Sequence, residues 1–311
     1  MEHISVLKND VQKYLQLSEG ATVVDCTLGL GGHSKDILNL IGKDGRLFAF
    51  DQDVRNLDEA AKRLNQFSDQ LTLINDNFRY LKTRVTGHGV EEVDAILLDL
   101  GLSSPHIDEA NRGFSFNKQG PLDMRFDPDG ELTAYEVVNQ YSVDELAEIF
   151  FKYGEERMGK KIARLICEQR EISDFKTTTE LAEFINAKVG SSKGKRAKSS
   201  HPATQVFQAL RIEVNDELAA LEEVLEQSVD ILAMGGRLVV ISYHSLEDRI
   251  VKQFFKSLLK PPGDGVYSNH GDPLVESLTK KPVVPLEKEI EENPRSRSAK
   301  LRAIKKIKPY P

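Results

Sequence analysis

Short apolar runs alternate with segments of helical spacing through the first hundred residues, and this alternation restricts the fold more than any other feature. Runs typical of buried strands occur at 21–26, 46–51, 71–74 and 93–99, with helical patterns between them at 33–40 and 54–65. Buried strands that are joined through helices form parallel sheets covered on both faces. The pattern therefore predicts an α/β fold with a Rossmann-like sheet.

The alternation is interrupted between residues 107 and 205, where helical patterns at 143–152, 158–170 and 178–189 replace it. The α/β pattern then resumes with a helix at 216–234 that Gly235 and Gly236 should end, a strand at 237–242, a helix at 246–259, a loop at 261–300 and a final strand at 301–307. We expect a sheet domain formed by 1–106 and 206–311, with an inserted, mainly helical domain at 107–205.

Charge and cysteine content narrow the class of protein. The net charge is −7, yet residues 151–205 hold twelve Lys/Arg against seven Asp/Glu, whereas residues 107–150 hold three against ten. A chain that is acidic overall can still present a basic face to phosphates, although a solvated helical surface explains the same charges. Two cysteines, no Cys/His spacing typical of metal sites, no apolar run of membrane-spanning length and no signal peptide predict a cytoplasmic protein without disulfides, metal or a membrane partner.

The loop after the first predicted strand, residues 25–34, is rich in glycine and leads into a helix. Glycines let a ligand approach the backbone, and a helix start offers unpaired N–H groups at the edge of the sheet where ligands bind. A dinucleotide fingerprint needs a glycine where Ser34 stands, so the loop fits a methyl donor better than NAD. An NAD-dependent oxidoreductase is the rival enzyme class, and a tight turn without a ligand is the structural alternative.

Two further positions support a cofactor that contains adenosine. Asp51 ends the second predicted strand, where a carboxylate can accept hydrogen bonds from both ribose hydroxyls. NAD enzymes use the same carboxylate, so Asp51 indicates adenosine rather than one particular cofactor. Phe78 follows the third strand, where its ring would pack on an adenine or, equally, in the core.

The loop after the fourth strand indicates the chemistry. Asp99 is followed by Ser103, Ser104, Pro105 and His106. A short Ser/Pro loop beside the reactive methyl can place hydrogen-bond acceptors on the N–H groups of an amine, which helps a conjugated nitrogen to become pyramidal in the transition state. The loop resembles that of amino-methyltransferases that act on DNA bases, but it departs from their pattern with one proline and a histidine in place of the aromatic residue. A capping turn is the structural alternative.

These motifs resemble those of the bacterial MraW/RsmH family of ribosomal RNA methyltransferases. The resemblance rests on nine blocks in family order that cover nearly the whole chain: residues 29–34, 99–105, 112–116, 120–125, 153–157, 201–204, 207–212, 242–249 and 293–298. It implies a class I S-adenosylmethionine methyltransferase sheet interrupted by a helical substrate domain. The implied reaction is methylation of the exocyclic amino group of a cytidine in 16S rRNA near the decoding site, which gives N(4)-methylcytidine.

The same resemblance implies site residues. The family's cofactor contacts carry over to Gly31, Gly32, His33, Asp51, Phe78, Asp99 and His106. In this assignment Asp99 contacts the methionine amino group. Other family members carry glutamine at position 106, which argues against a catalytic role for the His106 imidazole. Ser103 and Ser104, in the loop that contains Pro105, are the candidates for orienting the amine of a base that has left its stack.

For substrate binding we expect basic residues of the inserted domain and polar residues at motif positions: Arg157, Lys161, Lys193, Lys195, Arg196, Lys198, His201, Arg211, Asn215 and His244. The implied partner is 16S rRNA within the small ribosomal subunit, and a homodimer is left open. Two alternatives are a non-catalytic RNA-binding or ribosome-assembly factor and a methyltransferase for another amine. The intact glycine and aspartate positions of the cofactor loops argue against the first.

Overall fold

The computed structural model describes residues 5–190, 201–260 and 272–310. The chain divides into two compact units, one formed by Met1–Gly101 with Leu218–Pro311 and the other by Leu102–Glu217. Each unit is built around its own buried apolar side chains.

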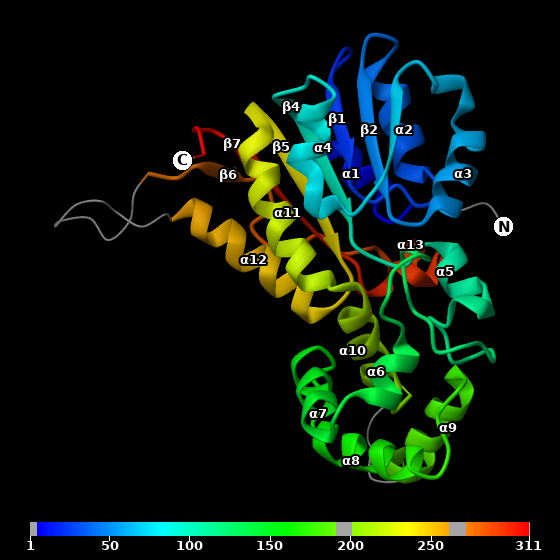
Figure 1. The fold of residues 1–311 in the computed structure, drawn as a ribbon. Helices are drawn as coiled ribbons and strands as arrows, with labels where there is room; N and C mark the ends of the chain where they lie inside the picture. The colour runs from blue at the N-terminus through cyan, green and yellow to red at the C-terminus, as the bar shows by residue number, and fades with distance from the viewer. Residues whose placement is uncertain (1–4, 191–200, 261–271, 311) are drawn as a thin grey trace, which may run out of the picture. The chain divides into compact units, whose positions relative to one another are not determined.

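A seven-stranded sheet organises the first unit, with the strand order β3-β2-β1-β4-β5-β7-β6 (Figure 1). Its strands are β1 (Thr22–Asp25), β2 (Arg46–Asp51), β3 (Leu71–Asn75), β4 (Val93–Asp99), β5 (Leu232–Ser242), β6 (Val275–Ser277) and β7 (Lys300–Lys306). Strands β1 to β5 pair in parallel, while β7 runs antiparallel to both β5 and β6. The strand order reverses between β1 and β4. Ligands of open parallel sheets bind beyond the carboxyl ends of the strands at such a reversal.

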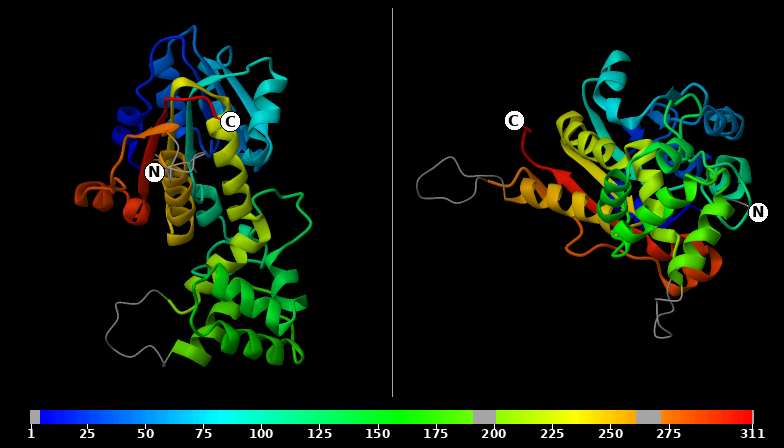
Figure 2. Two further views of the ribbon diagram at one scale, coloured as in Figure 1. Left: turned by 90° about the vertical axis from the view of Figure 1, so that its left-hand side faces the viewer. Right: turned by 60° about the horizontal axis from the view of Figure 1, so that its bottom comes forward.

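Alternating side chains of the strands build a core on each face of this sheet. Along β4, Ile96 and Leu98 belong to one core, and Ala95 and Leu97 belong to the other. The first core is closed by α4 (Leu81–Gly87), α11 (Glu217–Ile231) and α12 (Ser245–Leu259), and the second by α1 (Lys8–Leu15), α2 (Gly32–Ile41) and α3 (Val54–Arg63) (Figure 2). A strand buried on both faces is apolar at every position, which explains the continuous apolar runs in the sequence.

The helix predicted at 216–234 is wrong at its C-terminal end. Helix α11 ends at Ile231, and Leu232 already begins β5, so the following pair of glycines lies within the strand. Leu232 pairs with Val93, after which the register between β4 and β5 shifts. Gly235 lies at this irregularity and has a φ of 86°, a backbone conformation that glycine adopts without strain.

The prediction of a loop at 261–300 is also wrong for the part of this range that the structure describes. This part contains β6, the helix α13 (Glu287–Glu292) and the 3-10 helix η5 (Pro294–Ser298). Strand β6 is three residues long and α13 has no buried residue, so neither element carries the apolar periodicity from which sequence predicts structure. The final strand, predicted at 301–307, is confirmed as β7.

The second unit consists mainly of helices (Figure 1). They are α5 (Ser104–Asp108), η3 (Ala110–Arg112), α6 (Ala134–Gln140), α7 (Val143–Lys152), α8 (Gly159–Arg170), α9 (Thr178–Val189) and α10 (Thr204–Asn215). Two further 3-10 helices, η1 (Asn65–Phe67) and η2 (Phe78–Tyr80), belong to the first unit. Across the described part of both units, every helix is too short or too polar to span a membrane.

Capping boxes explain where three helices of the second unit begin. Ser142 accepts a hydrogen bond from the backbone N–H of Glu145 at the start of α7, and Glu145 accepts one from the N–H of Ser142. Thr177 and Glu180 form the same arrangement at α9, and a third capping box starts α6. Each box pairs N–H groups that the first helical turn leaves without an intrahelical partner.

The units divide at Gly101/Leu102 and Glu217/Leu218, whereas the sequence pattern placed the divisions at 106/107 and 205/206. Helix α10 accounts for the second difference, because Val206 and Leu210 pack in the core of the helical unit. His106 accounts for the first, because its ring centroid lies 4.9 Å from that of Phe114 and 5.2 Å from that of Phe126.

Candidate active site

The loop between β1 and α2 requires glycine for its path. Gly31 is the N-cap of α2 with a φ of 77°, and a Cβ there would lie 2.9 Å from Cδ1 of Leu64. Gly29 also has a positive φ, and its backbone N–H donates to Oδ2 of Asp51 at 2.9 Å. Left-handed backbone and close packing both favour glycine. Gly32 then begins α2, whose first-turn N–H groups have no partner within the helix.

Asp25, at the end of β1, is closed to a ligand. Its side chain is 1% exposed, and it accepts hydrogen bonds from Oγ of Ser34 at 2.7 Å and from the backbone N–H of Thr27 at 3.0 Å. Burial raises the pKa of Asp25, although these hydrogen bonds lower it. Asp25 therefore stabilises the glycine loop through these buried hydrogen bonds.

Asp51, at the end of β2, is partly exposed and also holds the loops around it. Its Oδ1 accepts from the N–H of Asp53 at 2.8 Å, and its Oδ2 accepts from Gly29 and from Nδ2 of Asn56 at 3.1 Å. Burial raises the pKa of Asp51 to about 7, although these three hydrogen bonds lower it. A carboxylate has about four lone-pair sites, so one site is left for a ligand hydroxyl, and a second hydroxyl would replace the Asn56 amide.

Asp99, at the end of β4, meets a partner at each carboxylate oxygen. The Tyr243 hydroxyl donates to Oδ1 at 2.7 Å, and Nε2 of the buried His33 lies 3.6 Å from Oδ2. Burial alone would lower the pKa of His33, but the Asp99 carboxylate, assisted by Asp25, outweighs burial and raises it. The structure thus brings together His33 and Asp99, two of the cofactor contacts expected from the sequence.

Phe78 begins η2 directly beyond the third-strand loop. Its ring is partly buried and packs against the core that contains Leu81 and Val85. The side-chain amide of Asn75 donates to the backbone oxygens of Asp51 and Gln52 at 3.0 and 3.2 Å, which ties this loop to the end of β2. The partial exposure is compatible with both roles predicted for the ring, core packing and contact with an adenine.

The residues predicted to orient the amine lie at the start of the second unit. Ser103 is at the N-cap position of α5, Ser104 begins that helix, and Pro105 lies in its first turn. His106 is buried, and its ring packs with Phe114 and Phe126. Phe116, the other phenylalanine of that segment, packs edge to face on Phe207. The aromatic packing gives His106 a structural role within its unit, and its cofactor contact stays a prediction.

Arg211 and Asn215 are both engaged inside the second unit. Nε and Nη2 of Arg211 donate to the two carboxylate oxygens of Glu217 at 2.7 and 2.8 Å. The Asn215 amide accepts from the N–H of Phe126 at 2.7 Å and donates to the backbone oxygens of Met124 and Arg211 at 2.8 Å each. Asn215 therefore uses both of its N–H donors to hold the chain around Met124, and substrate contact by either residue stays a prediction.

His201 precedes α10 and is exposed. Its Nδ1 accepts from the N–H of Ala203 at 3.2 Å, and its ring lies 4.8 Å from that of Phe116. Both contacts are within the second unit, and the residue is exposed despite them. A contact with the substrate therefore stays a prediction for His201.

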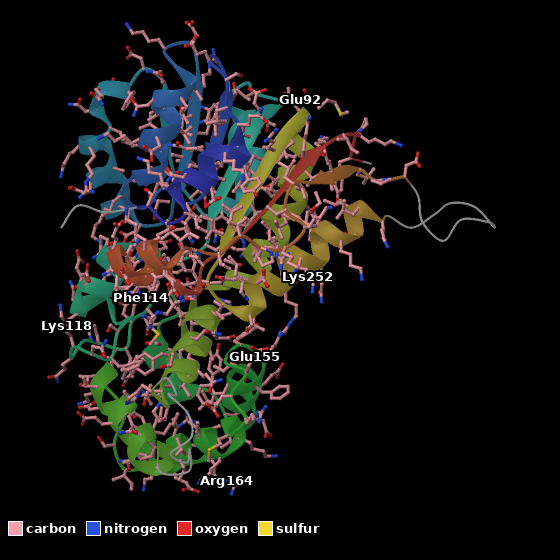
Figure 3. The ribbon with its side chains drawn as sticks, turned by 180° about the vertical axis from the view of Figure 1, so that it is seen from behind. Glu92, Phe114, Lys118, Glu155, Arg164 and Lys252 are labelled. Atoms are coloured by element: carbon pink, nitrogen blue, oxygen red, sulfur yellow. The ribbon has the colours of Figure 1, made fainter. Side chains whose placement is uncertain are left out.

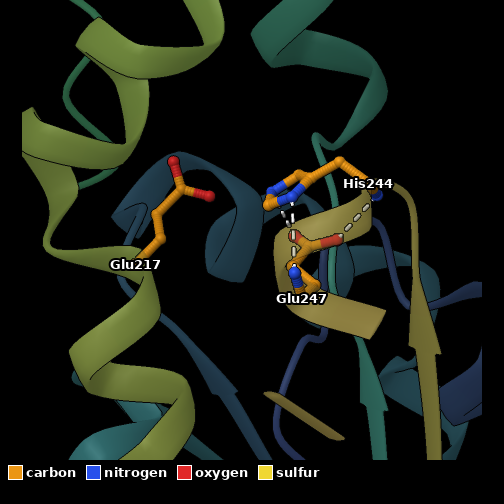
Figure 4. Close-up of side chains that lie close together, drawn as sticks. All are labelled: Glu217, His244 and Glu247. Atoms are coloured by element: carbon orange, nitrogen blue, oxygen red, sulfur yellow. Dashed lines mark hydrogen bonds and ion pairs between the residues drawn. The ribbon is translucent and has the colours of Figure 1, made fainter. Parts of the chain in front are cut away.

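His244 belongs to the first unit and is the N-cap of α12 (Figure 4). Its Nδ1 accepts from the N–H of Glu247 at 3.4 Å, and its Nε2 lies 3.1 Å from Oε1 of Glu247. Glu247 in turn accepts at Oε2 from the N–H groups of Tyr243 at 2.7 Å and His244 at 3.1 Å. This capping box gives His244 a structural role and fixes the backbone at Tyr243.

The predicted RNA contacts at α8 are exposed. Arg157 lies just before this helix and Lys161 in its first turn, and Arg164 of the same helix is exposed as well (Figure 3). The other four basic candidates, Lys193, Lys195, Arg196 and Lys198, lie outside the described residues.

Sequence reasoning missed the partners that hold Asp99. Besides the Tyr243 hydroxyl, Oγ1 of Thr27 accepts a hydrogen bond from the Asp99 N–H at 2.7 Å. The signal that could have found them was position: Asp99 pairs with Ile241 across β4 and β5, so a residue just beyond β5 comes to the same edge. The conclusion needed the strand order, which the sequence did not provide.

The parallel sheet with its antiparallel β7, the glycine loop at the reversal of strand order and the partly exposed carboxylates after β2 and β4 define a Rossmann-like class I methyltransferase fold. The chain belongs to the MraW methylase family, whose model matches residues 1–307. Its cofactor is S-adenosylmethionine.

Solved structures similar to this chain include three bacterial proteins. A putative rRNA-methylase from Clostridium thermocellum is 15% identical with a TM-score of 0.44, and an rRNA methylase from Streptococcus thermophilus is 14% identical with a TM-score of 0.45; each match covers 99% of this chain and 100% of the other. A putative methyltransferase from Streptococcus mutans, solved in complex with SAH, is 13% identical with a TM-score of 0.46 and coverages of 98% and 100%.

Proposed function

We propose that this methyltransferase acts on the exocyclic amino group of a cytidine in 16S rRNA near the ribosomal decoding site, giving N(4)-methylcytidine. Family membership supports methyl transfer. The nine motif blocks that resemble the bacterial MraW/RsmH proteins support the ribosomal cytidine. The observation that carries the proposal is the pair of His33 and Asp99, which lie 3.6 Å apart beside the glycine loop, at the edge of the sheet where a cofactor is expected.

The residues present fit the methionine end of the cofactor. Asp99 is 22% exposed, and the 3.6 Å between its Oδ2 and Nε2 of His33 exceeds a hydrogen bond. This oxygen can therefore accept a stronger, charge-assisted bond from an ammonium group. The residues proposed to hold the cofactor are Gly31, Gly32, His33, Asp51, Phe78, Asp99 and His106.

The proposed reaction is a direct displacement. When bound, the cofactor supplies the methyl group from a sulfonium, whose sulfur leaves as a neutral thioether. Ser103 and Ser104, in the loop made rigid by Pro105, would accept hydrogen bonds from the amine and free its lone pair from the ring. The amine proton becomes acidic as the nitrogen–carbon bond forms, so it can leave to water and a strong base is not required. Cys26 is buried and burial raises its pKa, which does not suit a covalent nucleophile.

We further propose that the helical insertion recognises the RNA, within the predicted range 107–205. The exposed residues Arg157 and Lys161, with the basic segment that contains Lys193, Lys195, Arg196 and Lys198, would contact phosphates. His201, Arg211, Asn215 and His244 are the proposed polar contacts. The proposed partner is 16S rRNA in the small ribosomal subunit.

A transfer assay with labelled cofactor tests the proposal. The protein is incubated with unmethylated small subunits, naked 16S rRNA and DNA, and the modified nucleoside is then identified by digestion and mass spectrometry. We expect label in N(4)-methylcytidine from one of the RNA samples. Label that is missing from cytidine in every RNA sample would refute the proposed function.

The same materials separate the alternatives. Stabilisation against heat by S-adenosylhomocysteine but not by NADH excludes an oxidoreductase. A non-catalytic assembly factor would bind small subunits and transfer no label. Label in DNA alone would indicate a methyltransferase for another amine.

A further inference from the structure

Tyr243 is the first residue after β5, at the edge of the sheet where β4 also ends. Asp99 pairs with Ile241 in these neighbouring strands, so the Tyr243 side chain can reach the Asp99 carboxylate. Its hydroxyl donates to Oδ1 of Asp99 at 2.7 Å, a length typical of a strong bond from a hydroxyl to a charged carboxylate. Neither the motif blocks nor the proposed chemistry assigns this hydroxyl a role.

The fold holds the Tyr243 ring independently of Asp99. The Tyr243 N–H donates to Oε2 of Glu247 at 2.7 Å, so its backbone is tied to the start of α12. A Cβ at Gly101 would lie 2.9 Å from Cε2 of Tyr243, so glycine at this position makes room for the ring. The ring also packs against the core that contains Val239 and Ile241. Tyr243 can therefore orient Asp99, rather than the reverse.

The Tyr243 hydroxyl stays protonated and so remains a hydrogen-bond donor. Burial and the negative charge of Asp99 raise the pKa of Tyr243 well above its usual value, so the hydroxyl keeps its proton at neutral pH. A donor fixed at Oδ1 stops rotation of the carboxylate about its Cβ–Cγ bond. The second oxygen then faces His33 in the first turn of α2.

We propose that Tyr243 is a positioning residue for the cofactor: its hydroxyl fixes the Asp99 carboxylate so that Oδ2 faces the first turn of α2 and can accept the ammonium group of the methionine moiety. The inference rests on the proposed role of Asp99 in cofactor binding. It requires no contact between the Tyr243 hydroxyl and the cofactor. Asp51 needs no such partner, because backbone N–H groups of adjacent loops hold both of its oxygens.

Two ligands that share adenosine but differ in the amino-acid moiety test this inference. S-adenosylhomocysteine carries the ammonium group and 5′-methylthioadenosine lacks it. Tyr243→Phe removes the hydroxyl and keeps the ring. By isothermal titration calorimetry, we expect the variant to bind S-adenosylhomocysteine about tenfold more weakly and 5′-methylthioadenosine within about twofold of the wild type.

A double-mutant cycle shows whether the hydroxyl acts through Asp99. In an Asp99→Asn background, Tyr243→Phe should cause little further loss of S-adenosylhomocysteine affinity. Gly101→Ala, which crowds the ring, should reproduce the ligand-selective loss. Tyr14→Phe is the matched control, because Tyr14 packs against the same core and its hydroxyl makes no hydrogen bond among the described residues. This control should leave both affinities unchanged.

Three results would overturn the inference: unchanged S-adenosylhomocysteine affinity in Tyr243→Phe, an equal loss for both ligands, or a full additional loss in the Asp99→Asn background. Thermal unfolding of each variant identifies a loss that comes from misfolding, and Gly101→Ala then provides the answer from an independent change. Wild-type protein that binds neither ligand would instead reject the cofactor site itself, and this inference with it.

Discussion

Asp25, Asp51 and Asp99 are each the last residue of one of three neighbouring strands, but Asp25 pairs with Ala49 and Leu97, two residues before Asp51 and Asp99. Asp25 is sealed beneath the glycine loop, whereas Asp51 and Asp99 are partly exposed. A carboxylate can bind a ligand only if an oxygen is both accessible and incompletely paired. Burial therefore distinguishes a structural aspartate from two candidate cofactor contacts, although all three end a predicted strand.

The raised pKa of Asp51 predicts pH-dependent cofactor binding. Burial raises this pKa to about 7, so most of the free protein carries a protonated Asp51 at pH 6 and an ionised one at pH 8. The ionised form accepts a ribose hydrogen bond, and affinity scales with the fraction of that form. S-adenosylhomocysteine should thus bind about tenfold more tightly at pH 8 than at pH 6 in calorimetric titrations.

Asp51→Asn is the control for this pH profile. The variant should bind more weakly at every pH and lose the rise around pH 7. A profile that persists in Asp51→Asn would assign the titration to another group, with His33 the first candidate because its pKa is also shifted.

The glycine loop predicts a stability effect at a single residue. Gly31→Ala places a Cβ on a backbone with a φ of 77° and 2.9 Å from Leu64. Left-handed backbone alone should cost about 1–2 kcal/mol of the free energy of unfolding. Gly87→Ala is the matched control, since a Cβ there meets nothing within 4 Å and its φ is not positive. Urea midpoints check both, and equal midpoints for the two variants would contradict the prediction.

Among the helices, local signals predicted the bounds well where both ends are set by nearby residues. The predicted helices at 143–152 and 178–189 match α7 and α9, both of which begin at a capping box encoded within four residues. The helix predicted at 216–234 extends past the end of α11, because that end is set by the pairing of Leu232 with Val93. That pairing joins residues far apart in the sequence, and no local pattern reports it.

Helix α8 and the residues just before it carry the exposed basic side chains with which RNA binding can be tested. Arg157→Ala and Lys161→Ala should each weaken binding to 16S rRNA fragments, nearly independently of their sequence. The slope of log affinity against log salt should fall by about one for each phosphate that the variant no longer neutralises. Filter binding over a salt series measures both quantities.

Lys43→Ala, an exposed lysine of the first unit, provides the comparison for this salt series. Its slope should equal that of the wild type. Identical slopes in all three variants would remove Arg157 and Lys161 from the proposed interface.

The chain forms one unit from two segments that are distant in the sequence and a second unit from the residues between them. The interruption of the strand pattern predicted such an insertion. The limits differ because α10 and His106 pack with the helical unit. Core membership decides where a unit ends, and the residues of α10 have the same helical spacing whichever core they join.

Local patterns of residues were enough to predict the α/β class, the position of the glycine loop, and the placement of Asp51 and Asp99 at strand ends, because apolar runs and clustered glycines are visible within a few residues of sequence. The sequence also carried the family motifs that indicated a methyltransferase. The strand order of the folded sheet was needed to learn that β5 lies beside β4, and therefore that Tyr243 meets Asp99 opposite His33. The structure also shows that Arg211 and Asn215 form hydrogen bonds within their own unit. These outcomes depend on which distant segments pair and pack, and no single stretch of sequence contains that information.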